Sequence, residues 1–285
     1  MTLPNFLIIG AGKSGTTSLY HWLREHPDVF LPSLKEPFFL TYDPDDPRVQ
    51  GWPFPITSLR EYEALFDGVT TERAIGEATP AYLDSPVAPR RIRELLGSPR
   101  MIVSLRDPVS RVFSYAQMAI RLGSATDLSA EVRRRAASDP HPYAPKLKTY
   151  FEMFGRDGIA IVLYDDVVAD PDVVCARLFR FLDVDDGFAP HTGVVHNPGG
   201  LPRSRLAQRV IETPALRALK PLIPARAASA LVARIRKANL RPPEPLDPQL
   251  RREVAARFRG DVLRTQELIQ RDLTGWLEPG SDDDG

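Results

Sequence analysis

Short, continuous apolar runs alternate with helical patterns over residues 6–182 of the chain. The runs that we expect to form strands are 6–9, 29–31, 73–77, 101–105 and 159–164. Runs of this kind are typical of strands buried on both faces. Because helical patterns separate them, the sequence predicts an α/β fold of three layers with a mainly parallel central sheet. Right-handed crossovers then bring the carboxyl ends of the strands, and any ligand, to one edge.

The composition is that of a globular protein. The 285 residues are 43% hydrophobic and 26% charged, with 37 basic and 37 acidic side chains. These values exclude a disordered or fibrous chain, and the balanced charge argues against coating nucleic acid through bulk charge. We expect a single domain over residues 1–285 with a helical C-terminal region. Within it, we expect a variable basic helical lid at 200–245 and a flexible acidic tail at 278–285.

Cysteine content and hydropathy indicate the compartment. Cys175 has no other cysteine to pair with, which excludes an intramolecular disulfide framework. It lies in an apolar periodic stretch, so we expect a buried thiol rather than a nucleophile. No apolar run approaches the ~18 residues of a membrane span, and residues 1–10 lack the features of a signal peptide. We therefore expect a soluble, cytoplasmic protein.

A turn rich in glycine and hydroxyl residues joins the first predicted strand to a helix. Its candidate anion ligands are Gly12, Lys13, Ser14, Gly15, Thr16, Thr17 and Ser18. Glycine lets the backbone approach a ligand closely, and a helix N-terminus offers free N–H groups at the positive end of its dipole. The lysine and the hydroxyl groups add further donors. The pattern predicts a cradle for phosphate or a chemically similar anion.

Two common nucleotide-binding motifs fit this turn poorly. A Walker A motif needs a glycine five residues before the Gly-Lys-Ser step, where this chain has Leu7. The pattern Gly-x-Gly-x-x-Gly does match at Gly10, Gly12 and Gly15. A dinucleotide site also needs an acid at the end of the second strand, and Glu36, near the expected distance, does not end an apolar strand. A different kind of anion site is therefore favoured.

A second anion-binding pattern follows the predicted strand at 101–105. Arg106 stands at the carboxyl end of that strand, on the same edge as the first turn. Arg111 and Ser114 follow in the next predicted helix, and two guanidinium groups with a hydroxyl can share one anion. The alternative is a salt bridge between Arg106 and Asp107 at the start of this helix, with Arg111 exposed.

The two patterns together resemble the sulfotransferases, in particular the branch related to heparan sulfate sulfotransferases and their bacterial relatives. The segments that carry the resemblance are 12–19, 26–27, 35–39, 76–82 and 106–115. The resemblance implies a P-loop-like fold and 3′-phosphoadenosine 5′-phosphosulfate (PAPS) as the sulfuryl donor. It implies that residues 12–18 bind the 5′-phosphosulfate and that Arg106 and Ser114 bind the 3′-phosphate. A late basic segment with Arg203 and Ser204 would close over that 3′-phosphate.

The resemblance also implies the residues that carry the chemistry. Lys13 would meet the sulfate and the 5′-phosphate, where a compact positive charge suits a leaving group. Glu36, in a Glu-Pro-x-Phe segment, would act as general base on the acceptor, shielded from water by the neighbouring phenylalanines. The alternative for Glu36 is a surface acid paired with Lys35. His196, in a glycine-containing loop, is a competing base.

Asp165 and Asp166 end the predicted strand at 159–164, as the acids of a Walker B strand do in a kinase. Without a Walker A turn, a structural role for these acids is favoured. No spacing of His and Cys typical of a metal site occurs elsewhere in the sequence. We therefore predict no catalytic metal.

The sequence leaves the partner and two other functions open. We expect the acceptor to be a small molecule, a glycan or a lipid, and we expect no nucleic acid. The basic stretch 201–243 holds ten Lys and Arg with one acid, so contact with a membrane surface is also open. The alternatives to in-line sulfuryl transfer are a P-loop-type nucleotide kinase and a non-catalytic module that binds nucleotides or polyanions.

Overall fold

The computed structural model describes residues 2–43, 45–46, 54–138, 142–193, 200–202, 240–241 and 245–278. Two compact units make up the chain. The first comprises residues 1–111, 140–197 and 255–281, and the second comprises 112–139, 198–254 and 282–285. The expectation that residues 1–285 form a single domain stays a prediction.

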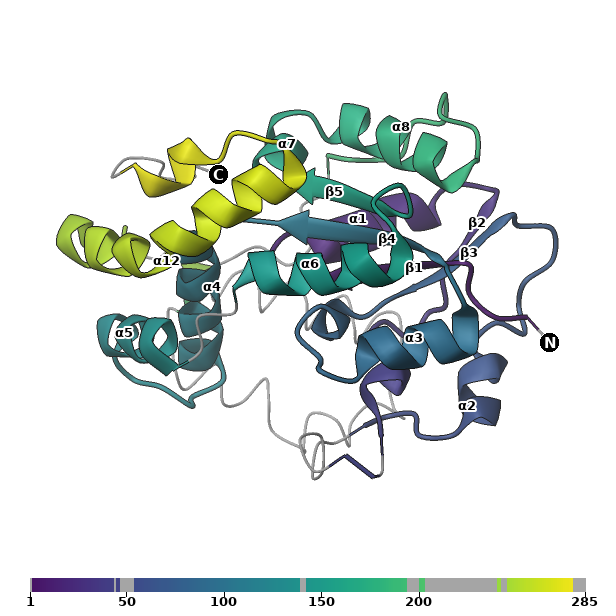
Figure 1. The fold of residues 1–285 in the computed structure, drawn as a ribbon, viewed down its shortest axis with the longest axis horizontal. Coiled ribbons are helices and arrows are strands. Elements are labelled where there is room, and N and C mark those ends of the chain that lie inside the picture. Colours follow the sequence, from purple (N-terminus) through teal and green to yellow (C-terminus); the bar gives the residue numbers. More distant parts are fainter. Residues whose placement is uncertain are drawn as a thin grey trace. The chain divides into compact units, whose positions relative to one another are not determined.

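A five-stranded sheet forms the centre of the first unit (Figure 1). Its strands are β1 (Phe6–Gly10), β2 (Val29–Phe30), β3 (Ala74–Ala78), β4 (Arg100–Leu105) and β5 (Ile159–Leu163). They pair in the order β2-β3-β1-β4-β5, and every pairing is parallel. β1 is buried along its whole length, as its apolar sequence predicts. The predicted parallel sheet is confirmed, and its strands end at one common edge.

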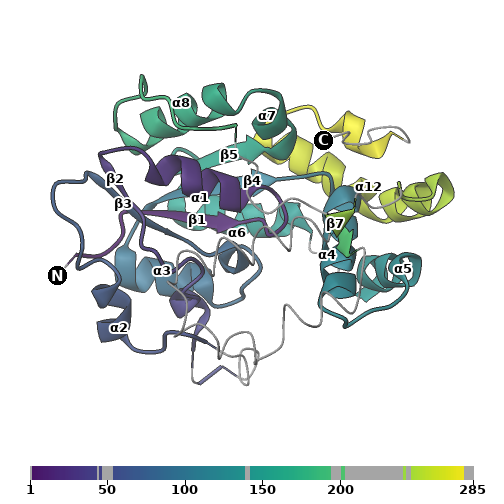
Figure 2. The same cartoon turned by 180° about the vertical axis from the view of Figure 1, so that it is seen from behind.

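Helices cover both faces of this sheet (Figures 1 and 2). α1 (Thr16–Arg24) and α8 (Pro171–Leu182) pack on one face, whereas α3 (Ala88–Leu96) and α6 (Tyr143–Phe154) lie on the other. The Asp261 carboxylate caps α6 by accepting from its first two N–H groups at 2.7 and 3.0 Å. This order of helix, sheet and helix gives the three layers predicted from sequence.

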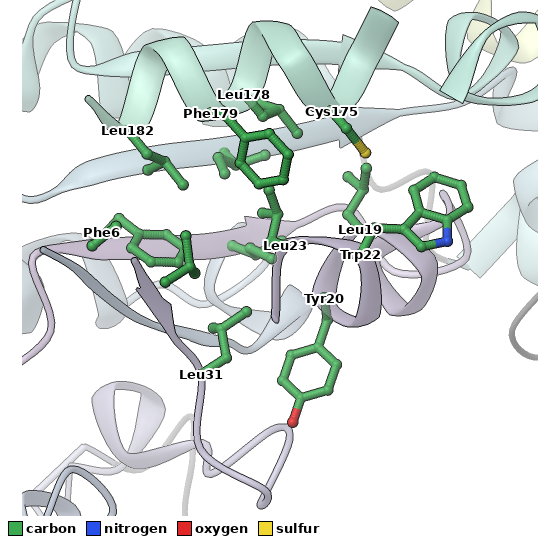
Figure 3. Close-up of a cluster of buried hydrophobic side chains, with 14 of the residues drawn as sticks. Phe6, Leu19, Tyr20, Trp22, Leu23, Leu31, Cys175, Leu178, Phe179 and Leu182 are labelled. Carbon is green, nitrogen blue, oxygen red and sulfur yellow. The ribbon is translucent and has the colours of Figure 1, made fainter. Parts of the chain in front are cut away.

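A cluster of buried apolar side chains joins α1 and α8 to the sheet (Figure 3). Phe6 enters it from β1, Leu19 and Leu23 from α1, and Phe179 and Leu182 from α8. Each large apolar side chain that is fully buried here contributes on the order of 2 kcal/mol to folding. The start of α1 is therefore fixed relative to the end of β1, which positions the glycine-rich turn between them.

Cys175 lies in the same cluster and is fully buried. Burial, with a smaller effect from Asp172, raises the pKa of its thiol to about 12. A thiol that stays protonated at neutral pH is not a nucleophile. The predicted burial of the thiol is confirmed, and its raised pKa supports the prediction that it is not a nucleophile.

The first unit also contains several shorter elements. They are η1 (Phe39–Thr41), α2 (Leu59–Ala64), η2 (Pro80–Tyr82), α7 (Tyr164–Ala169) and η4 (Thr274–Leu277). α2 begins with a capping box, in which the Ser58 hydroxyl accepts from the Glu61 N–H and the Glu61 carboxylate accepts from the Ser58 N–H. α7 is not predicted from the sequence, because Tyr164 continues the apolar run of β5.

The described part of the second unit is mostly helical. α4 (Pro108–Arg121) begins in the first unit and continues into the second, α5 (Leu128–Ser138) lies in the second, and α12 (Pro248–Ile269) begins in the second and ends in the first. β6 (Leu201–Pro202) and β7 (Leu240–Arg241) form an antiparallel pair that is too short to predict from sequence. Most of the predicted basic lid and of the acidic tail lies outside the described residues. Within the described ranges, no helix combines the length and the hydropathy needed to cross a membrane.

Candidate active site

The glycine-rich turn connects β1 to α1 at the carboxyl edge of the sheet. Gly15 is the N-cap residue of α1 with a φ of 80°, and no side chain caps this end of the helix. A Cβ atom on Gly15 would lie 3.0 Å from a ring carbon of Tyr164, so both the conformation and the space require glycine. The first turn of α1 carries no acidic side chain. The turn therefore meets the positive end of a helix dipole, as an anion site requires.

Hydrogen bonds from β4 and α4 fix the backbone of this turn. The Ala11 N–H donates to the Ser104 carbonyl oxygen at 2.7 Å. The Ser104 hydroxyl donates to the Ser14 carbonyl oxygen at 2.5 Å. The Arg111 Nε donates to the Gly12 carbonyl oxygen at 3.1 Å. The shape of the turn is therefore set by its neighbours.

Arg111 holds the turn rather than lying exposed. Its side chain is only 4% exposed, and its guanidinium lies 3.2 Å from the Asp84 carboxylate. Asp84 also binds the Lys146 Nζ at 2.5 Å. Helical spacing alone could not predict these contacts, because Gly12 and Asp84 come from other parts of the chain. We identify Arg111 as a positioning residue that ties the Gly12 carbonyl to Asp84.

Arg106 follows β4 directly. Its guanidinium carbon lies 4.2 Å from the centre of the Tyr164 ring, which is a cation–π contact. The Tyr143 hydroxyl donates to the Arg106 carbonyl oxygen at 2.9 Å. Asp107 caps α4, since its carboxylate accepts from the Ser110 N–H at 3.2 Å and the Ser110 hydroxyl at 2.8 Å. These contacts fix the backbone on both sides of the Arg106 side chain.

Tyr164 brings the two predicted anion sites together. Its ring lies against Gly15 and also carries the Arg106 guanidinium. β1 and β4 are neighbours in the sheet, and the chain leaves them toward opposite sides. Such a switch point is where open α/β sheets bind ligands. The structure thus places the glycine-rich turn and Arg106 at one site, whereas Ser114 belongs to the second unit and its role stays a prediction.

Glu36 lies beside the end of β3. Its N–H donates to the Ala78 carbonyl oxygen at 3.0 Å, and its carboxylate pairs with the Lys35 Nζ at 2.5 Å. The Glu36 side chain is 40% exposed, so the predicted shielding from water is not found. The reason is that Phe39 is buried and stacks on Tyr62, with ring centres 4.5 Å apart. The carboxylate of Glu36 therefore has both an ion-pair partner and an exposed surface.

Residues of the two candidate loops have unusual backbone conformations. Lys13, Glu36 and Phe38 have φ values of 68°, 62° and 58°, in the left-handed region that side chains disfavour. Among the described residues, the other non-glycine positions with positive φ are Asp183 and Gln270. Both of these follow the last residue of a helix, where this conformation is common. Strain at Lys13 and Glu36 has no such explanation and is typical of functional loops held by their surroundings.

Glu77, in β3, is a buried acid that the sequence does not single out. It is fully buried and accepts hydrogen bonds from the hydroxyl groups of Tyr82 at 2.5 Å, Thr79 at 2.8 Å and Tyr62 at 3.3 Å. Burial raises the pKa of Glu77 to about 7, although these hydrogen bonds and the charge of Lys35 act to lower it. The feature of the sequence that could have identified Glu77 is its position as an acidic residue inside a strand that is predicted to be buried.

Asp165 and Asp166 contact the C-terminal part of the first unit. The Trp276 Nε1 donates to Asp165 at 2.9 Å, and Arg271 pairs with Asp166 at 3.0 Å. These contacts support the structural role predicted for the two acids. In the part of the chain that the structure describes, no three His, Cys, Asp or Glu side chains are grouped as a metal site requires. Catalysis without a metal stays a prediction.

The remaining predicted residues are placed only in part. Residues 16–18 form the first turn of α1, and the side chains of Ser14, Thr16 and Ser18 are buried. His196, Arg203 and Ser204 lie outside the described residues.

Known proteins match this chain in sequence. The family model described as "Sulfotransferase domain" matches residues 3–188. The chain is 34% identical over 122 residues to the membrane-associated sulfotransferase kil1 of Dictyostelium discoideum, covering 42% of this chain and 24% of that protein. It is 29% identical over 190 residues to heparan sulfate glucosamine 3-O-sulfotransferase 6 of Mus musculus, covering 63% and 52%. The chain thus spans about a quarter of the first relative and about half of the second.

A solved structure matches over nearly the whole chain. The sulfotransferase from Alicyclobacillus acidocaldarius is 27% identical, with a TM-score of 0.70, and the match covers 98% of this chain and 100% of that one. The family match at 3–188 includes the glycine-rich turn, Glu36, Glu77 and Arg106.

Proposed function

The chain belongs to the sulfotransferase domain family, and we propose that it transfers a sulfuryl group from PAPS to a hydroxyl or amine of an acceptor. The observation that carries this proposal is the meeting of the glycine-rich turn and Arg106 at Tyr164. Two anion sites on neighbouring strand ends suit a donor with charged groups at its 5′ and 3′ positions. ATP and NAD have no 3′-phosphate.

The residues of the first unit fit the two ends of this donor. Residues 12–18 would hold the 5′-phosphosulfate through backbone N–H groups and hydroxyls, at a helix end that no side chain caps. Arg106 would hold the 3′-phosphate, because a guanidinium presents a planar fork to phosphate oxygens. We propose Ser114 and Arg203 as further ligands of that phosphate.

In the proposed reaction, the acceptor oxygen or nitrogen bonds to sulfur while the bond from sulfur to the 5′-phosphate oxygen breaks. Lys13 stabilises the negative charge that gathers on the leaving phosphate. Glu36 takes the proton of the acceptor, and the exposed surface of its carboxylate supports this role. The strained backbones of Lys13 and Glu36 further support the assignment, since in-line transfer depends on precise placement of both groups.

We propose a glycan, a small molecule or a lipid as the acceptor. The name of the mouse relative, a heparan sulfate glucosamine sulfotransferase, favours a glycan among these. A cytoplasmic location and contact of the basic stretch 201–243 with an acidic membrane surface are further proposals. Cell fractionation tests the first, and co-sedimentation with vesicles that contain or lack acidic lipid tests the second.

The two alternative functions have less support. A kinase would need Asp165 and Asp166 for magnesium, but these acids are engaged by Trp276 and Arg271. A module that only binds nucleotides would use the glycine-rich turn, yet it would not account for the strained backbone at Glu36.

Calorimetry with 3′-phosphoadenosine 5′-phosphate (PAP), AMP and ATP tests the donor. We expect PAP to bind at least about tenfold more tightly than AMP, because a guanidinium–phosphate contact contributes well over 1 kcal/mol. Arg106→Ala should abolish this preference. Arg73→Ala is the matched control, since Arg73 forms an exposed ion pair with Asp183. Equal affinity for PAP and AMP would contradict the proposed donor.

The variant Glu36→Gln tests the general base. We expect PAP affinity to be kept and turnover of PAPS, measured over a panel of glycan, lipid and small-molecule acceptors, to fall about a hundredfold or more. Glu152→Gln, at an exposed position on α6, is the control. Unchanged turnover in Glu36→Gln would remove Glu36 from this role.

A further inference from the structure

Glu77 and its hydroxyl partners form a buried cluster beside the segment that carries Glu36. Tyr62 reaches Glu77 from α2, Tyr82 reaches it from η2, and both tyrosines are fully buried. The charged group that acts on Glu77 is Lys35, which is also the ion-pair partner of Glu36. The proposed reaction uses no acid at this buried position, so any effect of Glu77 must act through its neighbours.

Tyr82 connects Glu77 to the segment 36–41. Its hydroxyl donates to the Glu77 carboxylate at 2.5 Å and accepts from the Leu40 N–H at 3.4 Å. One hydroxyl group therefore bridges the buried acid and the backbone of η1. Tyr82 lies in η2 and Leu40 lies in η1, so this hydroxyl group joins two elements that are far apart in sequence.

Two further contacts attach the same segment. Phe39 stacks on Tyr62, whose hydroxyl also donates to Glu77 at 3.3 Å. The Glu36 N–H donates to the carbonyl oxygen of Ala78, the residue that follows Glu77 in β3. The cluster therefore contacts the middle and the end of the segment, and the β3 residue next to Glu77 holds its beginning.

We propose that Glu77 is a positioning residue for Glu36: its carboxyl group orients Tyr82 and Tyr62, and these side chains hold the backbone of residues 36–41. A positive φ at Glu36 and Phe38 is unfavourable, so this backbone needs such support. The inference rests on the proposed function for the role of Glu36 as base, but the contacts themselves do not depend on it.

The charge of Glu77 changes the strength of the bridge. As a carboxylate it accepts a hydrogen bond from the Tyr82 hydroxyl, which leaves the Tyr82 oxygen to accept from the Leu40 N–H. As a neutral acid it carries a proton of its own that competes with Leu40 for that oxygen. The pKa of Glu77 is raised to about 7, so this change falls near neutral pH. Among the described residues, the other titratable groups that act on it are Lys35, Tyr62 and Tyr82, and burial keeps the pKa of both tyrosines well above 10.0.

Amide hydrogen exchange on the full chain tests the proposal. After correction for intrinsic rates, we expect protection of the Glu36 and Leu40 amides to rise about tenfold as the pH increases through 7. Glu77→Gln should remove this dependence on pH, and Glu152→Gln on the surface of α6 should keep it. A merely structural role would lower protection equally at every pH. Protection in Glu77→Gln that equals the wild type throughout would overturn the proposal.

Two tyrosine variants keep the test decisive if Glu77→Gln does not fold. Tyr82→Phe and Tyr62→Phe each remove one hydroxyl that donates to Glu77, but only the Tyr82 hydroxyl reaches Leu40. We expect protection of the Leu40 amide to fall about tenfold in Tyr82→Phe and less than about twofold in Tyr62→Phe, whose ring can still stack on Phe39. Equal effects in the two variants would contradict the bridge.

PAP calorimetry on the same proteins separates this inference from the proposed function. We expect unchanged PAP affinity in Glu77→Gln, because the residues proposed to bind PAP follow β1 and β4, whereas Glu77 lies in β3. A wild-type chain that fails to bind PAP would contradict the proposed function, while the exchange data would still judge the role of Glu77. Normal PAP binding together with unchanged exchange at Leu40 would contradict the inference alone.

Discussion

The two sides of the candidate site are held in place by different chemistry. The glycine-rich turn is held by backbone hydrogen bonds and by Arg111, a buried cation that pairs with Asp84. The segment that carries Glu36 is held by neutral hydroxyl groups around one buried acid, Glu77. A guanidinium keeps its charge at all physiological pH values, whereas an acid with a pKa of about 7 does not. We call the side with the glycine-rich turn the donor side and the side with Glu36 the acceptor side. We therefore expect the structure of the donor side to be insensitive to pH and that of the acceptor side to respond to it.

The largest expected effect is on the donor side, in Arg111→Ala. Removing a buried cation leaves the Gly12 carbonyl without this donor and leaves Asp84 with one ion-pair partner fewer. We expect the free energy of unfolding to fall by about 4 kcal/mol, by the same amount at pH 6 and pH 8. Urea denaturation measures it. Arg73→Ala, which removes an exposed pair, should cost less than about 1 kcal/mol. A loss in Arg111→Ala that varies with pH would break the contrast between the two sides.

The second effect concerns the acceptor side and follows from the raised pKa of Glu77. The pKa is about 7 in the folded chain and 4.5 in the reference state, so between these values the folded chain binds more protons. The free energy of unfolding therefore falls as the pH rises from 4.5 to 7, by about 3 kcal/mol for this group, and is steady above that range. Glu77→Gln should lack this fall, whereas Glu152→Gln should follow the wild type.

Denaturation of the three proteins at pH 5 and pH 8 measures this difference. The free-energy gap between wild type and Glu77→Gln should shift with pH in favour of the variant at pH 8. A gap of equal size at both pH values would mean that the pKa of Glu77 is ordinary in the folded chain.

The third effect returns to the donor side, where Gly15→Ala combines two penalties. Alanine is strained at a φ of 80°, and its Cβ would lie 3.0 Å from the Tyr164 ring. Gly97 is the matched control, because it has a φ of 73° but no atom within 4 Å of the added Cβ. We expect PAP affinity to fall about thirtyfold in Gly15→Ala and to stay unchanged in Gly97→Ala, although both lose about 1 kcal/mol or more of stability. Equal PAP affinities in the two variants would mean that the turn does not bind the donor.

The contrast between the two sides also explains what could be predicted from sequence. The strand, turn and helix around residues 12–18 are contiguous, so local patterns predict both the fold and the anion site there. Arg106 is predictable because a strand end has a known place in a parallel sheet. The cluster around Glu77 is assembled from separate elements, α2, β3 and η2, and no local pattern reveals that two tyrosine hydroxyls meet one acid.

Burial is the second limit on prediction from sequence. Spacing places Arg111 on the helix after Arg106, but it does not reveal that Gly12 and Asp84 lie beside it. Similarly, an acid followed by Pro and two phenylalanines predicts a shielded Glu36, whereas Phe39 is used in the core.

The smallest expected effect is at Tyr164, the residue that contacts both proposed anion sites. Tyr164→Phe keeps the ring that contacts Arg106 and should leave PAP affinity unchanged. Tyr164→Leu removes the cation–π contact, so the Arg106 side chain loses its support and PAP affinity should fall about fivefold, equivalent to about 1 kcal/mol. Calorimetry at pH 6 and pH 8 should give the same ratio, because neither the ring nor the guanidinium changes charge in this range. A larger loss in Tyr164→Phe would mean that the hydroxyl, and not the ring, is what connects Arg106 to the turn.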